Sequence, residues 1–109
     1  MPLMGNVKQG ASLKISITCG LKNQGITLVD LGANPVAGED APEPDEYQVA
    51  PGATEDQIGS GKVPTKITRL YLDVTLPDGG TATLRVQSGK KVWTRDLDDD
   101  ASWLFLVSP

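Results

Sequence analysis

Five residues, Asp96-Leu97-Asp98-Asp99-Asp100, form the densest cluster of carboxylates in the chain. Asp96, Asp98 and Asp100 have the D-x-D-x-D spacing that opens a calcium loop, because hard cations bind carboxylate oxygens. An EF-hand would continue with glycine and then glutamate, at positions where this chain has alanine and valine. We therefore interpret the run as a solvated acidic turn. The alternative is a calcium site of another type, with Asp96, Asp98 and Asp100 as the metal ligands.

Histidine, the side chain that most often transfers protons near neutral pH, does not occur in the 109 residues. Catalytic groups of the Ser-His-Asp and Cys-His types are therefore excluded. The single cysteine, Cys19, cannot supply the ligands of a zinc site, and we expect it to be buried as a small apolar side chain. We predict that the protein is not an enzyme and that it needs no cofactor.

A phosphate-binding loop is suggested by the run Gly59-Ser60-Gly61-Lys62. That motif also requires a glycine five residues before the Gly-Lys pair, and a serine or threonine after the lysine. This chain has Asp56 and Val63 at those positions. We therefore interpret the run as a flexible turn.

Two tryptophans, Trp93 and Trp103, lie in neighbouring predicted strands. Core packing or a cross-strand pair is the structural interpretation. The functional alternatives are a platform on which a sugar stacks, with Trp93 and Trp103 as ligand-binding residues, or the centre of a protein interface, where tryptophan is enriched.

The elements that would position these side chains are β-strands. From 67 to 76 apolar and polar residues alternate, which places Arg69, Tyr71 and Asp73 on the outward face of a half-buried strand. Turn residues at 77–80 and 88–90 separate this strand from the next two, so we predict a four-stranded meander. The predicted strands are 12–19, 26–31, 67–76, 82–87, 92–97 and 102–107.

These strands predict one all-β domain spanning 1–109, a small antiparallel β-sandwich or a partly open barrel of about six to seven strands. The segment 33–66 is rich in proline and acids, and we expect most of it to be a long irregular loop or arm. Within it, Tyr47 and Val49 indicate a short edge strand between two prolines. The spacing of Thr54 and Gln57 predicts a helical turn.

Charge is distributed unevenly, with eight acids and no base between 30 and 61. Such a surface repels phosphate backbones, so we expect no nucleic-acid partner. No run approaches the length of a membrane span, and the start of the chain lacks the apolar region of a signal peptide. We expect a soluble protein made in the cytoplasm without a signal peptide, with no membrane partner.

The last predicted strand, Trp103-Leu104-Phe105-Leu106-Val107, is apolar on both faces. A sandwich edge in water should avoid this pattern. Either the strand is central and the 33–66 loop covers its second face, or one of its faces, Leu104 with Leu106 or Trp103 with Phe105, meets another subunit. These four residues are the predicted interface.

We therefore expect a non-enzymatic structural or protein-interaction module, a β-rich subunit of a homo-oligomer or particle such as a virion decoration or tail component. Its partner would be a protein or another copy of itself. The alternative is a carbohydrate- or calcium-binding module that uses Trp93, Trp103 and the 96–100 turn.

Overall fold

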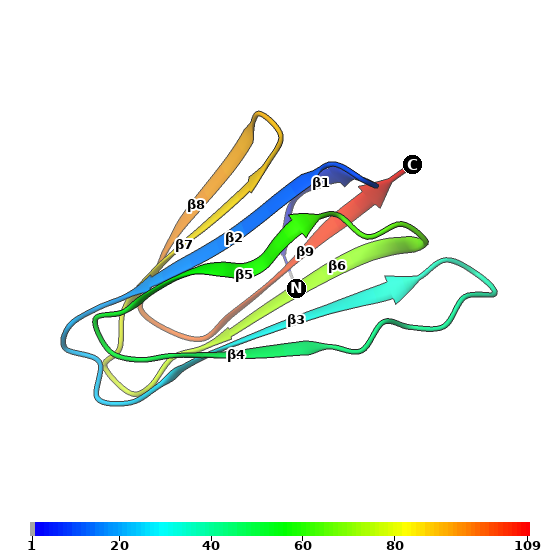
Figure 1. Ribbon diagram of the computed structural model, residues 1–109. Helices are drawn as coiled ribbons and strands as arrows, with labels where there is room; N and C mark the ends of the chain where they lie inside the picture. The colour runs from blue at the N-terminus through cyan, green and yellow to red at the C-terminus, as the bar shows by residue number, and fades with distance from the viewer. Residues whose placement is uncertain (1) are drawn as a thin grey trace.

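The computed structural model describes residues 2–109, except for the side chains of residues 56, 57, 59 and 60. The described residues form nine β-strands in two sheets (Figure 1). In chain order the strands are β1 (Leu3–Lys8), β2 (Ser12–Cys19), β3 (Thr27–Pro35), β4 (Asp45–Val49), β5 (Thr54–Lys62), β6 (Ile67–Thr75), β7 (Ala82–Ser88), β8 (Lys91–Leu97) and β9 (Ala101–Ser108). The predicted all-β sandwich is confirmed, with more strands than expected.

The two sheets share no described strand. The five-stranded sheet has the order β1-β9-β6-β3-β4, and the four-stranded sheet has the order β5-β2-β7-β8. Bonded neighbours are antiparallel except β1 and β9, which are parallel. Because the chain crosses repeatedly between the layers, most strands that are neighbours within a sheet are distant in sequence (Figure 1).

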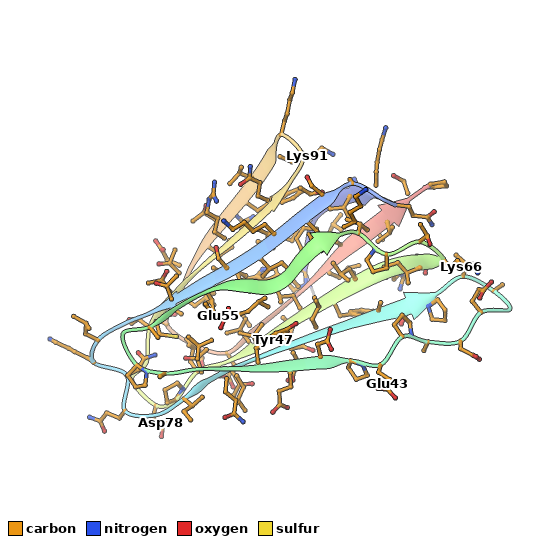
Figure 2. All side chains as sticks on the ribbon, viewed as in Figure 1. Glu43, Tyr47, Glu55, Lys66, Asp78 and Lys91 are labelled. Atoms are coloured by element: carbon orange, nitrogen blue, oxygen red, sulfur yellow. The ribbon has the colours of Figure 1, made fainter. Side chains whose placement is uncertain are left out.

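The core lies between the sheets, where side chains fill the space between the ribbons (Figure 2). Alternation turns Ile15 and Ile17 of β2 into this core from one sheet, and Leu72 of β6 and Phe105 of β9 from the other, and all four are fully buried. Burying one such side chain contributes roughly 1.5–3 kcal/mol relative to leaving it exposed. Cys19 is buried with a free thiol, as predicted.

The predicted meander after residue 67 was wrong, although its strands exist. β6 and β9 belong to the five-stranded sheet, whereas β7 and β8 form a hairpin in the other. The turn at 77–80 is tight, since Gly80 N–H donates to the Pro77 carbonyl at 2.8 Å, but it links the two sheets. The Asp100 carboxylate accepts a hydrogen bond from the Leu76 backbone N–H at 2.8 Å, which ties this connection to the one before β9.

The segment 33–66 is less irregular than expected, because β3 continues to Pro35 and both β4 and β5 lie within it, whereas 36–44, 50–53 and 63–66 belong to no strand. The short edge strand predicted around Tyr47 is β4, and Tyr47 packs against the core between β4 and β5 (Figure 2). No helical turn begins at Thr54, because β5 starts there and pairs with β2. The side chains of the capping residue at 57 and of residues 59 and 60 lie outside the described part of the chain.

Strand β1 was not predicted, because a register shift between Leu3 and Gly5 interrupts its alternation. Met4 and Val7 nevertheless reach the core from it. None of the residues that the structure describes belongs to a helix long and apolar enough to cross a membrane.

Candidate functional site

Strand β9 lies inside the five-stranded sheet, between β1 and β6. Its inward side chains are in the core, since Phe105 is 0% and Trp103 8% exposed. These two residues are therefore removed from the predicted interface. Leu104 is only partly buried and Leu106 is 39% exposed, so the 33–66 segment does not cover the outward face of β9. Leu104 and Leu106 remain as the predicted interface residues.

Strand register arranges the outward side chains of the five-stranded sheet in rows that run across the strands. In one row, Glu46 of β4 lies opposite Asp30 of β3, which lies opposite Asp73 of β6. We call these three carboxylates the acidic row. Like charges directly opposite each other in neighbouring strands destabilise a sheet. Within the described residues none of the three forms an ion pair, and no group of acids, histidines or cysteines is arranged to hold a metal.

The next row along the strands is apolar. Tyr71 of β6 lies opposite Leu104 of β9, which is paired with Leu3 of β1, a side chain that is 55% exposed. On the other side of Tyr71 is Gly32 of β3, above which a Cβ would meet no atom within 4 Å. Asn34 donates a hydrogen bond from its Nδ2 to the Tyr71 Oη at 2.7 Å, which holds the ring in place. We call Tyr71, Leu104 and Leu3 the apolar row.

The third row carries a positive charge. Arg69 of β6 lies between Asn34 of β3 and Leu106 of β9, and Asn6 of β1 follows Leu106. All four side chains are exposed. We call this set the Arg69 row, and the three rows together the docking face. Acidic, apolar and cationic groups therefore follow one another along the strands.

The two tryptophans are not cross-strand neighbours, because Trp93 is on β8 of the four-stranded sheet and Trp103 is on β9 of the other. The ring of Trp93 meets that of Phe105 edge-on, with centroids 5.2 Å apart. It also covers Gly5 of β1, where an added Cβ would lie 2.6 Å from the Trp93 Cε2 atom. Trp93 therefore packs between the sheets at their β1 and β8 edges. With Trp103 almost fully buried, the two rings do not form an exposed platform for a sugar.

The carboxylates proposed as calcium ligands have separate partners. Asp96 Oδ1 accepts a hydrogen bond from Thr83 Oγ1 at 3.1 Å, and Asp100 Oδ1 accepts one from the Leu76 N–H. Asp96 and Asp98 line an open cavity of about 480 Å³ at the end of β2, β7 and β8, which Thr18 also lines. The described residues do not bring Asp96, Asp98 and Asp100 together as a metal site.

Sequence reasoning placed Arg69, Tyr71 and Asp73 on one outward strand face, but it did not connect them with Asp30, Glu46 or Leu104. These residues come from separate segments of the chain, and only the register of the strands aligns them. No family model, curated protein or solved structure matches this chain.

Proposed function

We propose that this protein is a non-enzymatic β-sandwich module that binds a protein partner through its docking face, as a subunit of a homo-oligomer or larger particle. One observation carries the proposal. The inward side chains of β9 lie in the core, yet its outward side chains Leu104 and Leu106 are also apolar, and β9 is a central strand of its sheet. Antiparallel sheets with one face in water normally place polar residues on that face. Contiguous apolar surface is typical of interaction sites.

The composition of the docking face supports this function. Protein interfaces have an apolar centre enriched in tyrosine and arginine and depleted of acids, with a polar rim. Here the apolar row of Tyr71, Leu104 and Leu3 is bordered on one side by the acidic row and on the other by the Arg69 row. The absence of histidine from the sequence supports a binding role over a catalytic one.

The size of the docking face predicts weak binding by a single copy. Three outward rows roughly 6.8 Å apart, each crossing up to four strands about 4.8 Å apart, give an area on the order of 400 Å². Stable interfaces bury about 800 Å² on each partner. We therefore expect association that depends on concentration, or that is strengthened where several copies bind together in one assembly.

The test is the mass of the protein in solution, by size-exclusion chromatography with light scattering across a wide concentration range. Leu104→Lys and Leu106→Lys should abolish association, because each places a charge within the docking face. Val92→Lys is the matched control, since Val92 is 48% exposed but lies on β8 of the other sheet. Association that Val92→Lys reduces as much as Leu104→Lys would contradict the proposal. So would a wild-type protein that stays monomeric at every concentration.

A small polar ligand is the second candidate, and the cavity lined by Asp96, Asp98 and Thr18 favours it. The carboxylates of this cavity would accept hydrogen bonds from a sugar, and its hydroxyls would donate hydrogen bonds to one. The same carboxylates could instead bind a cation together with water. Asp96→Asn should then remove any rise in melting temperature that calcium or a sugar causes.

A further inference from the structure

We propose that the partner of the docking face is a second copy of this chain, related by a two-fold axis that runs across the strands along the apolar row. The inference rests on the docking function proposed above and adds the identity and orientation of the partner. It is carried by the order of charges along the strands, which makes the face complementary to itself.

Strand β6 contains the pattern in its simplest form. Asp73, Tyr71 and Arg69 point outward in succession, so a negative and a positive side chain lie at equal distances on either side of an aromatic ring. Neither Asp73 nor Arg69 forms an ion pair with any residue that the structure describes. Both charges are therefore available to a partner.

Rotation by 180° about an axis across the strands at Tyr71 lays β6 over β6 of the second copy in the opposite direction. Arg69 then faces Asp73 of the second copy, and Tyr71 faces its own equivalent. Two-fold symmetry forms each such contact twice, as in any isologous interface. Sheets that pack face to face keep their strands within about 30° of alignment, so this arrangement is a normal sheet packing.

Strand β3 follows the same order. Asp30 and Asn34 lie two residues on either side of Gly32, in the acidic row and the Arg69 row. The same rotation places the Asn34 amide, which can donate a second N–H, opposite the Asp30 carboxylate of the second copy. Gly32 then faces Gly32, where the open space above each glycine lets the two sheets approach.

The charges also exclude the other two-fold arrangement of the same faces. An axis parallel to β6 would place Arg69 over Arg69 and Asp73 over Asp73, and like charges across an interface suppress association. In the proposed arrangement, each Arg69 instead reaches the acidic row of the other copy. It thereby offsets the repulsion among the three carboxylates that each chain carries by itself.

The experiment measures the dimer dissociation constant by sedimentation velocity at low and high salt. Arg69→Asp and Asp73→Arg should each raise this constant about tenfold or more, because two attractive contacts become repulsive. The double variant R69D/D73R should restore self-association, since the exchanged charges face each other again. Thermal melting at low concentration checks that each variant folds, which we expect because Arg69 is exposed and Asp73, though half-buried, lies on the outer face of the sheet.

Mixing experiments test the orientation separately. R69D and D73R, each weakly associating alone, should form a heterodimer when mixed. The double variant should pair with itself but not with wild-type protein, because that mixture would oppose Arg to Arg and Asp to Asp.

Three results would overturn the inference. Association that Leu104→Lys abolishes but R69D and D73R leave unchanged would keep the docking function and refute this two-fold arrangement. A double variant that stays as weak as the single variants would refute the pairing of Arg69 with Asp73. Wild-type protein that is monomeric throughout would refute the second copy as partner, and the docking function with it.

Discussion

The outer faces of the two sheets differ in how their polar groups are partnered, although both sheets bury apolar inner faces. On the four-stranded sheet, register places Thr54, Thr18, Thr83 and Asp96 in one row. The Thr18 and Thr54 hydroxyls lie 3.3 Å apart, and Thr83 donates to Asp96. On the five-stranded sheet, the acidic row places carboxylate opposite carboxylate with no donor between them.

This difference separates the residues that specify the fold from those available for function. Inward side chains decide that two sheets pack together, and they are alike in both layers. Outward side chains are free to vary. Where they form hydrogen bonds across strands of the same chain, the surface gains little from a partner. Where apolar side chains and unpaired charges remain exposed, as on the docking face, a partner can stabilise both.

The largest effect should come from comparing the two faces of β9 itself. Phe105→Ala should lower the free energy of unfolding by about 3–5 kcal/mol, because it leaves a cavity in the core. Leu104→Ala, one residue earlier and facing outward, should cost about 1 kcal/mol or less. Denaturant unfolding at low protein concentration measures both. Equal losses would mean that Leu104 is as important to the core as Phe105, which would remove it from the docking face.

Two glycines give the next largest contrast. Gly5→Ala should destabilise the protein by about 1–3 kcal/mol, because the new methyl group would meet the Trp93 ring between the sheets. Gly32→Ala is the matched control on the outer face, where a Cβ has open space. It should leave stability unchanged or raise it by about 0.4–1 kcal/mol, because alanine restricts the unfolded chain. At low protein concentration, the melting temperature should therefore fall for Gly5→Ala and stay level or rise for Gly32→Ala. A tolerated Gly5→Ala would contradict the packing assigned to Trp93.

The sequence predicts strands where apolar and polar residues alternate without interruption, as in β2, β6 and β7. It does not predict β5, whose pairing with β2 shifts register twice and which contains Gly61 with a φ of 137°. Nor does it predict that the turn at 77–80 connects the two sheets. The residues of a tight turn closed at Gly80 would be the same if the next strand paired within the same sheet. Local propensity determines the turn, and packing between distant segments determines where it leads.

The same limit applies to the docking face. Alternation is enough to predict that Arg69, Tyr71 and Asp73 point outward from one strand. The acidic row also needs Asp30 and Glu46, which join it only through pairing of β3 with β6 and with β4. Pairing register depends on contacts across the whole sheet. A single sequence can therefore indicate which side chains face outward, but not which of them lie opposite each other.

A smaller effect should follow from neutralising one charge of the acidic row. Asp30→Asn should raise the free energy of unfolding of the monomer by about 0.2–1 kcal/mol, because Asp30 lies between Glu46 and Asp73. The gain should shrink in high salt, which screens exposed charges. Asp78→Asn is the control, since Asp78 is an exposed acid in the 77–80 turn, outside that row and outside the 96–100 cluster. A loss of stability in Asp30→Asn would mean that the carboxylate has a stabilising partner within its own chain.

The smallest expected effect is that of calcium. It tests whether the four-stranded sheet binds a ligand, whereas the effect of protein concentration tests whether the five-stranded sheet binds a second copy. Millimolar calcium should leave the melting temperature unchanged, because Asp96 and Asp100 bind Thr83 and the Leu76 N–H and do not converge on one point. Raising the protein concentration should instead raise the melting temperature, since a second copy binds only the folded chain. A rise with calcium that Asp96→Asn removes would contradict this prediction. The cavity lined by Asp96 and Asp98 would then be a calcium-binding site, as the second candidate function requires.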